Sequence, residues 1–503
     1  MHDAIIGHYI AGCHIDTFQH SGVVYNPSTS EQIARCAYAD AAIVDLAVQA
    51  AISENARKWA KASHATRLQV LFKLRELLIE KTPLLAEIIG REHGKTLADA
   101  EGEIGRAIEG IEFACNAPHI TKGEYSRNVA GDIDVFSLRL PIGVVGCITP
   151  FNFPIMIPVV MTAMAVAVGN SIVFKPSEKV PSAAIFLAEL WQQAGLPDGV
   201  FNVVQGDKIT VDAMLAHPDI DAISFVGSTQ VGEYVYQQAT ALHKRVAAFT
   251  GGKNHMVVMP DADLDAAANA FISAGFGSAS QRCMAVSVLV PVGTETANQL
   301  KTLIIEKMQK LKVGAYNDPH ADFGAVISAQ SQHNILKSIQ QSIEDGAELV
   351  IDGADFLHAE HQQGFYVGPT LFDHLTTEMD LYRQEVFGPV RGILRVETLD
   401  EAIAVINQHE LGNGAVIFTA NGQAAQQFFM NVEAGMIGVN VPVPLPVSYF
   451  NFGGLRRSRF GESHLYGPDA ARFYTQLKTI SQKWPLSQTT PASAISLAFQ
   501  ITT

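Results

Sequence analysis

From residue 142 onward, short apolar stretches alternate with helical segments, and this alternation restricts the fold more than any other feature. "IGVVGCIT" (142–149) and "SIVFK" (171–175) are expected to be strands, with a helix over 155–168 between them. Further apolar strands are expected, after intervening helices, at 200–204, 222–227 and 245–249. Successive β-α-β units of this length favour a doubly wound parallel sheet.

The alternation resumes beyond residue 253, with strands expected at "HMVVM", "SVLVPV", "GAVIFT" and "MIGVNV". At 503 residues the chain is too long for a single hydrophobic core, so a second α/β domain is predicted. "GDIDVFSLRLP" (131–141) and "ARFYTQLKTI" (471–480) have strand character outside both sheets. Such segments are typical of an arm that contacts another subunit.

Composition and charge exclude several classes of protein. Lys and Arg total 35 against 50 Asp and Glu, and this net charge of −15 without a basic tract argues against nucleic acid as a partner. Five scattered cysteines and the absence of C-x-x-C or H-E-x-x-H spacing indicate a reducing cytoplasm and no metal site. "MHDAIIGHYIAG" lacks the features of a secretory signal. The apolar stretch 155–174 is interrupted by Pro158 and Gly169, so no membrane span is expected.

Polar groups follow three of the predicted strands. In open parallel sheets, ligands bind at the carboxyl ends of strands. Asn152 in "TPFNFP" either caps a turn or donates its amide to an oxyanion. Lys175 and Glu178 in "KPSEK" either bind ribose hydroxyls or form a surface ion pair. "GSTQVG" (227–232) either holds a pyrophosphate on free N–H groups or simply begins a helix.

Cys283 lies between small residues and an apolar run in "GSASQRCMAVSV" (277–288). It is either a nucleophile presented at a turn or a small apolar residue that fills a core, which is the commoner fate of a cysteine. The stretch alone does not decide between these two interpretations.

The motifs taken in order resemble the aldehyde dehydrogenase superfamily over essentially the whole chain. They are "PFNFP", "FKPSE", "FVGST", "GGKN", a cysteine and "EVFGP". More narrowly, "MVVMPDADLDAAANAFISAGFGSASQRCMAVSVLVPVG" and "VPVPLPVS" resemble the CoA-acylating methylmalonate-semialdehyde dehydrogenases.

This resemblance implies two doubly wound α/β domains with a small β oligomerisation arm, in a homodimer or homotetramer. The expected NAD-binding domain comprises 1–120 and 141–250, and the catalytic domain comprises 251–460. The arm would comprise 121–140 and 468–485, followed by a C-terminal tail, 486–503.

In that family the cysteine is the nucleophile, which assigns this role to Cys283. Its thiolate adds to an aldehyde, the thiohemiacetal gives hydride to NAD, and a thioester remains. The Asn152 amide and the Cys283 N–H would hold the oxyanion. The resemblance places the cofactor against Thr149, Phe151, Lys175, Glu178, Lys179, Ser228 and Thr250, with Glu385 on the nicotinamide ribose. An acidic Glu178 would repel a 2′-phosphate, which favours NAD over NADP.

Phe249 in "AFTGGKNH" bears on the second half of the reaction. Hydrolytic relatives carry here a glutamate that activates water, and phenylalanine cannot accept a proton. CoA needs less help, because a thiol pKa near ~8.5 leaves a few per cent thiolate at neutral pH. Acylating relatives usually have asparagine at this position, so Phe249 departs from both patterns.

We therefore expect acyl transfer to CoA. One alternative is a hydrolytic NAD-dependent dehydrogenase of another carboxylated semialdehyde, with a base recruited from elsewhere. Another is a binding protein that keeps only the scaffold, which the presence of Cys283, Asn152, Lys175 and Glu385 argues against.

Two arginines point to a carboxylated substrate. Arg282 directly precedes the predicted nucleophile, and Arg106 lies on the helix face opposite the apolar isoleucines of "EGEIGRAIEG". Arg106 read alone is equally a solvated surface residue. In the semialdehyde family both matching arginines hold the substrate carboxylate, for which a guanidinium has suitable geometry and charge. A malonyl-type acyl group would then lose carbon dioxide, so methylmalonate or malonate semialdehyde would give propionyl-CoA or acetyl-CoA.

Overall fold

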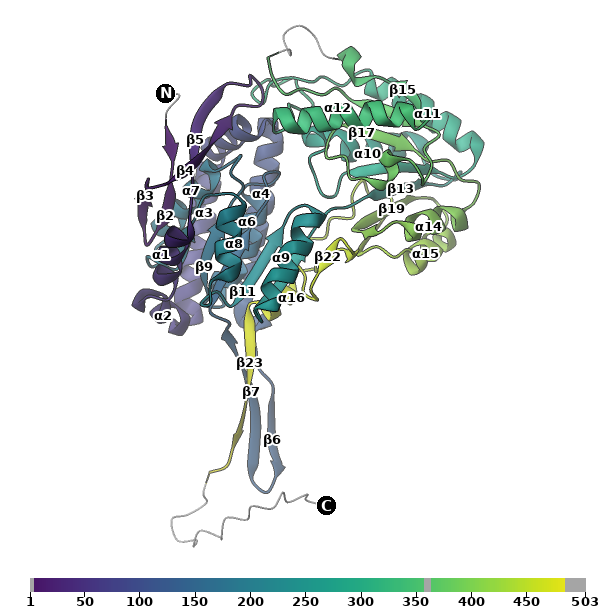
Figure 1. Ribbon diagram of the computed structural model, residues 1–503. Coiled ribbons are helices and arrows are strands. Elements are labelled where there is room, and N and C mark those ends of the chain that lie inside the picture. Colours follow the sequence, from purple (N-terminus) through teal and green to yellow (C-terminus); the bar gives the residue numbers. More distant parts are fainter. Residues whose placement is uncertain (1–3, 357–362, 485–503) are drawn as a thin grey trace, which may run out of the picture.

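The computed structural model describes residues 4–356 and 363–484 of the chain. Figure 1 shows two α/β bodies side by side and a slender arm of strands that extends away from the first body. The predicted tail 486–503 and the last residue of the predicted arm segment 468–485 lie outside the described residues.

The first body is built on an eight-stranded sheet. In spatial order its strands are β22 (Arg459–Phe460), β12 (Arg245–Phe249), β11 (Ala222–Val226), β8 (Val144–Ile148), β9 (Ser171–Lys175), β10 (Phe201–Val203), β2 (His8–Ile10) and β3 (Cys13–Ile15). The five strands from β12 to β10 are parallel, as the β-α-β pattern predicts. β22 falls within the range predicted for the second domain, yet it pairs antiparallel with β12 of this sheet.

Helices cover both faces of this sheet, as in a doubly wound fold. One face carries α3 (His64–His93), α4 (Leu97–Ala114), α6 (Met156–Ala167) and α7 (Ser182–Gln193). The other carries α1 (Ala41–Ala51), α8 (Lys208–Ala216) and α9 (Thr229–Ala241). Three shorter helices complete this body: α2 (Glu54–Lys61), α5 (Ala117–Ile120) and α16 (Pro468–Phe473).

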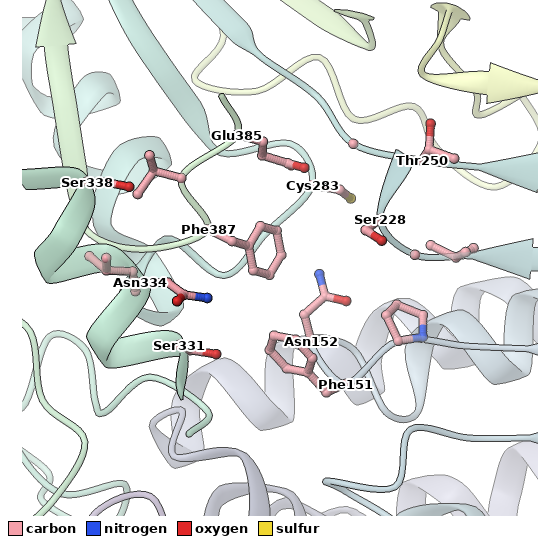
Figure 2. Close-up of a pocket in the computed structure, with 16 residues that line it drawn as sticks. Phe151, Asn152, Ser228, Thr250, Cys283, Ser331, Asn334, Ser338, Glu385 and Phe387 are labelled. Carbon is pink, nitrogen blue, oxygen red and sulfur yellow. The ribbon is translucent and has the colours of Figure 1, made fainter. Parts of the chain in front are cut away.

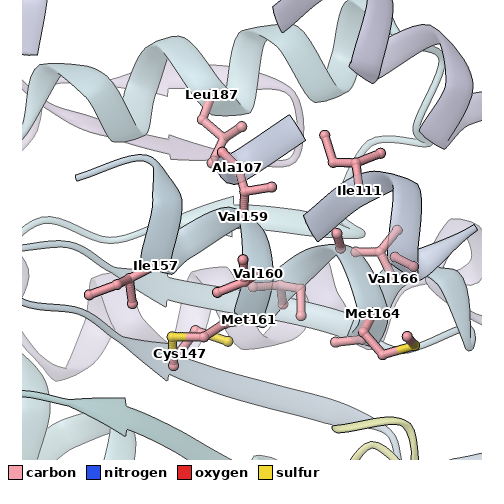
Figure 3. Packing of buried hydrophobic residues seen from close by; sticks show 14 of the residues in the cluster. Ala107, Ile111, Cys147, Ile157, Val159, Val160, Met161, Met164, Val166 and Leu187 are labelled. Carbon is pink, nitrogen blue, oxygen red and sulfur yellow. The ribbon is translucent and has the colours of Figure 1, made fainter. Parts of the chain in front are cut away.

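Helix α6 accounts for the first part of the long apolar stretch 155–174. All its residues from Ile157 to Ala167 are buried, because a helix that is apolar on every side must be covered on every side. Figure 3 shows it between α4 and the sheet, with Val159 near Ala107 of α4 and Met161 near Cys147 of β8. The chain then turns at Gly169, whose φ of 101° suits glycine, and continues as β9. Within the described ranges, no helix is long and apolar enough to cross a membrane.

The second body contains a seven-stranded sheet. In spatial order its strands are β15 (Glu348–Ile351), β16 (Thr370–Asp373), β17 (Val390–Ile393), β14 (Val286–Pro291), β13 (Asn254–Val258), β19 (Gly414–Phe418) and β20 (Met436–Val439). All pairs except β15–β16 are parallel, so the predicted second α/β unit is present. Its helices are α10 (Leu264–Phe276), α11 (Thr294–Met308), α12 (Ala329–Glu344), α13 (Asp380–Arg383), α14 (Leu399–Gln408) and α15 (Gly422–Asn431), with 3₁₀ turns at Gly277–Ser280 and Gly353–Phe356.

The arm is a three-stranded antiparallel sheet in the order β23 (Thr475–Gln482), β7 (Ile133–Pro141) and β6 (Tyr125–Ala130). The strand predicted over 471–480 is wrong at its start, because α16 occupies the residues up to Phe473. Pro468 sits in the first turn of that helix, where its missing N–H costs nothing. Two small sheets remain: β1 (Ile5–Ile6), β4 (His20–Tyr25) and β5 (Gln32–Tyr38) form one, and β18 (Leu411–Gly412) pairs with β21 (Leu455–Arg456).

Candidate active site

A cavity of about 340 Å³ lies between the two bodies, at the carboxyl ends of strands of the first sheet. The first body contributes residues that follow β8, β11 and β12, and the second contributes Cys283, the loop at Glu385 and one face of α12. Figure 2 shows these side chains converging from both sides. Six of the predicted site residues line the cavity: Phe151, Asn152, Ser228, Thr250, Cys283 and Glu385.

Cys283 is presented by an unusual turn after α10. Ser278, Ala279 and Ser280 all have positive φ, at 55°, 50° and 62°, in the left-handed region that few side-chain-bearing residues adopt. The Cys283 carbonyl accepts hydrogen bonds from Asn254 Nδ2 at 2.9 Å and from Asn413 Nδ2 at 3.0 Å. The main chain is thus fixed from behind while the sulfur lies at the cavity, as Figure 2 shows.

Burial, together with a smaller effect of the nearby Glu385 carboxylate, raises the pKa of the Cys283 thiol to about 12. The resting side chain is therefore a neutral thiol at physiological pH. Of the two interpretations of Cys283 open from the sequence, its position at the cavity favours the reactive one over the core-filling one.

Asn152 lies in the loop between β8 and α6, opposite Cys283. Figure 2 shows its amide directed into the cavity. The side-chain oxygen has no hydrogen-bond partner among the described residues, and α6 begins without a side-chain cap. The Asn152 amide is therefore not used to cap the helix that follows it, and it is available to a ligand.

Glu385 is the one carboxylate among the described residues that line the cavity. Its Oε1 accepts a hydrogen bond from the Gly252 N–H at 3.2 Å. Burial raises its pKa to about 6, against the opposing effects of that N–H and of Lys253. Lys253 itself is buried and donates to the carbonyls of Leu381 and Gln384, so it holds the loop that carries Glu385. Burial lowers the Lys253 pKa to about 7.

Thr149, Lys175, Glu178 and Lys179 do not line this cavity but lie beyond it, at and after the ends of β8 and β9. Lys175 is buried, which lowers its pKa, and its Nζ donates to the carbonyls of Pro176 at 2.5 Å and Gly206 at 2.9 Å. Its distance to the Glu178 carboxylate is 4.0 Å, so the pair is loose and Glu178 remains partly exposed. The Thr149 hydroxyl is buried without a partner among the described residues.

The two predicted carboxylate-binding arginines also lie outside this cavity, and both contact acidic residues of α4. Arg106 pairs with Glu109 at 2.5 Å and donates to the Pro446 carbonyl at 3.0 Å. Arg282 pairs with Asp99. Both arginines are partly buried, so Arg106 is not the freely solvated surface residue that its helical position alone would suggest.

One part of the cavity wall was not predicted. Four residues of α12 line it, spaced as one face of a helix: Ser331, Asn334, Ile335 and Ser338. Small polar residues on an amphipathic helix are also typical of an ordinary solvated face, so the sequence carries no signal that separates the two.

Phe249, at the end of β12, is buried and packs in the apolar core of the first body. It does not line the cavity. The residues that line the cavity after β12 are Thr250 and Gly251. No carboxylate group therefore stands at position 249 to activate water.

The family model "Aldehyde dehydrogenase family" matches residues 15–480. The chain belongs to this family. It is 48% identical over 478 residues to a malonate-semialdehyde dehydrogenase of Pseudomonas aeruginosa, covering 95% of this chain and 96% of that protein. It is 42% identical to an acylating, mitochondrial methylmalonate-semialdehyde dehydrogenase of Arabidopsis thaliana, covering 92% of this chain and 76% of that protein.

Solved structures of the family agree with the fold. A protein from Sinorhizobium meliloti, described as a methylmalonate-semialdehyde dehydrogenase in complex with NAD, superposes with a TM-score of 0.95 at 45% identity. The match covers 96% of this chain and 99% of that one. The methylmalonate-semialdehyde dehydrogenase of Oceanimonas doudoroffii gives 0.94 at 46% identity, with the same coverage. The predicted family and the predicted aldehyde dehydrogenase fold are both confirmed.

Proposed function

We propose that this aldehyde dehydrogenase oxidises malonate or methylmalonate semialdehyde with NAD and transfers the acyl group to CoA. The observation that carries the proposal is the cavity itself, where the Cys283 sulfur and the Asn152 amide face each other beside Glu385, with no carboxylate at position 249. The names of relatives 42–48% identical, which include acylating semialdehyde dehydrogenases, support the same substrate class and the use of CoA.

The residues of the first body fit NAD. Ser228 precedes α9 and makes no side-chain capping bond, so the first N–H groups of that helix are available to a pyrophosphate. The partly exposed Glu178 carboxylate suits ribose hydroxyls, and the unpartnered Thr149 hydroxyl is a buried polar group that a ligand would satisfy. Glu385 would hold the nicotinamide ribose. NAD, when bound, supplies the hydride acceptor.

The Cys283 thiol, neutral at rest, loses its proton to solvent and adds as a thiolate to the aldehyde carbon. The Asn152 amide and the Cys283 N–H stabilise the oxyanion that forms. Loss of hydride leaves an acyl thioester on Cys283. The CoA thiolate then attacks this thioester and releases Cys283. The substrate carboxylate, which Arg106 and Arg282 would hold, leaves as carbon dioxide when its bond to the neighbouring carbon breaks. The electron pair of that bond passes into the thioester carbonyl as an enolate, and a proton from solvent then gives the acetyl or propionyl group of acetyl-CoA or propionyl-CoA.

The first sheet would form the NAD-binding domain and the second the catalytic domain, with a boundary near residue 250. The arm formed by β6, β7 and β23 would join subunits into a homodimer or homotetramer, because its strands leave the body and expose Leu138 and Leu477. A cytoplasmic location is consistent with the bacterial relatives.

The test is product identification. Purified enzyme is mixed with NAD and malonate semialdehyde, with and without CoA, and NADH is followed by absorbance while the acyl product is identified by mass spectrometry. The proposal requires acetyl-CoA formed in step with NADH. Free acid as the main product in the presence of CoA would favour the hydrolytic alternative. Cys283→Ser is the matched control for non-enzymatic reaction.

A further inference from the structure

A buried ion pair outside the cavity contacts the loop that carries Asn152. Lys95 Nζ and Glu103 Oε2 are 2.8 Å apart, and the two side chains are 1% and 0% exposed. Lys95 lies in the short link between α3 and α4, just after Gly94, and Glu103 lies within α4. Neither residue takes part in the proposed chemistry.

Each member of the pair binds a different part of the loop's main chain. Lys95 Nζ donates to the Asn152 carbonyl at 2.6 Å. Glu103 Oε1 accepts from the N–H groups of Ile155 at 2.7 Å and Met156 at 3.1 Å. The pair therefore fixes the main chain at Asn152 itself and again three residues later, where α6 begins.

The two charged groups hydrogen-bond to the main chain of the loop, which apolar side chains could not do. Burying two ions is costly, and well-packed apolar side chains often replace such a pair without loss of stability. The N-terminus of α6 has no side-chain cap of its own, and the Glu103 carboxylate supplies acceptors for its first N–H groups. Lys95 neutralises that carboxylate and extends the link to Asn152.

We propose that Lys95 and Glu103 are positioning residues that hold the Asn152 amide at the point where the oxyanion forms. This inference rests on the proposed role of Asn152. Misplacement of a catalytic group by about 1 Å can cost on the order of 10²-fold in rate, so disruption of the pair would slow the chemical step. NAD binding would be retained, because Thr149, Lys175 and Ser228 make no hydrogen bond to either residue.

The experiment is a double-mutant cycle on the first turnover. Lys95→Met, Asn152→Ala and the variant with both changes are mixed with saturating NAD and malonate semialdehyde, and the rate constant of the NADH burst is measured. We expect Asn152→Ala to slow the burst about 10²- to 10³-fold, as loss of an oxyanion donor does elsewhere. Lys95→Met should slow it roughly 10- to 100-fold.

The combined variant decides the question. If Lys95 acts through Asn152, adding Lys95→Met to Asn152→Ala slows the burst no further than about threefold, since effects of residues that act as a unit do not add. Multiplying losses would overturn the positioning role, as would an Asn152→Ala variant as fast as the wild type. Failure of the proposed function is a separate result, because the wild-type enzyme would then form no NADH, or would turn over continuously to free acid without a single-turnover burst.

Two further variants guard against unfolding. Lys95→Met leaves a buried carboxylate unpaired, so Lys95→Met with Glu103→Gln removes both charges and keeps an amide oxygen for the α6 N–H groups. This neutral pair should melt close to the wild type and bind NAD normally, yet still give a slow burst. A wild-type burst from it would show that the charges are not needed for positioning.

Lys244→Met is the matched control. Lys244 is also a buried lysine, and it donates to the carbonyls of His217 and Ile220 at the opposite end of the first sheet. Its replacement should lower the melting temperature without changing the burst rate constant. If it slowed the burst as much as Lys95→Met, the loss would reflect general destabilisation.

Discussion

Replacing Arg106 with alanine should impair the use of carboxylated aldehydes while sparing simple ones. In the structure the Arg106 guanidinium pairs with Glu109 and donates to the Pro446 carbonyl, and its side chain is 27% exposed. The neighbouring Tyr466 hydroxyl donates to the same carbonyl at 2.9 Å. The arginine is thus held in a defined position and remains partly exposed, which suits the proposed contact with a substrate carboxylate.

The expected size of the effect follows from the contact it would remove. A hydrogen bond to a charged group contributes about 1.5–3 kcal/mol, which corresponds to roughly 10- to 160-fold in kcat/KM. Because Arg106 is partly solvated and already paired with Glu109, the lower part of this range is expected, about 10- to 30-fold. The assay compares kcat/KM for malonate semialdehyde with kcat/KM for propanal, in wild type and variant.

The ratio of the two kcat/KM values should fall by that factor, with propanal oxidation nearly unchanged. Arg75→Ala is the matched control, because Arg75 is similarly exposed and pairs with Glu112, also on α4, yet is not one of the two arginines proposed to bind the substrate carboxylate. It should leave both substrates unaffected. Equal losses on both substrates in Arg106→Ala would refute the clamp and assign Arg106 to packing of the 446 loop.

Three further results are expected. Cys283→Ala should abolish NADH formation while NAD binding and melting temperature are kept, and retained aldehyde oxidation would remove the nucleophile assignment. Glu385→Gln should speed alkylation of Cys283 by iodoacetamide at pH 8, measured by mass spectrometry. The carboxylate helps raise the pKa of that thiol to about 12, so its loss should lower this pKa and increase the thiolate fraction. Burial raises the pKa of Glu92 to about 7 from 4.5, so its favourable contribution to stability should be lost as pH rises through that window. The melting temperature of wild type minus that of Glu92→Gln should therefore decrease between pH 5 and 7.5, and a constant difference would contradict the shift.

Much of the fold was predictable because strands in parallel sheets are short apolar runs bounded by turn residues. The expected strands 171–175 and 245–249 coincide with β9 and β12. The segment 471–480 was harder, because its aromatic and β-branched residues suit a strand while Pro468 starts a helix just before it. The strand preference of these residues conflicted with a helix-start signal, the proline at 468, that lies before the segment.

The candidate site residues that lie in short sequence motifs could be predicted. Asn152, Cys283 and Glu385 sit in short, distinctive stretches and meet at one cavity. The contact between Lys95 and the site was not predictable, because Lys95 donates to a carbonyl 57 residues away. A lysine beside the start of a helix is normally exposed to solvent. Contacts of this kind depend on how the helices pack against one another, and the hydrophobic periodicity of a single segment does not specify that packing.

The most direct test of the central proposal is NADH formation in the first turnovers without CoA. With Phe249 in place of a carboxylate, the acyl thioester on Cys283 should persist, giving a rapid burst of about one NADH per active site and then a slow rate. Adding CoA should restore fast turnover and release acyl-CoA. Rapid multiple turnover to free acid without CoA would contradict this, and would mean that another group, with Glu385 the first to examine, activates water.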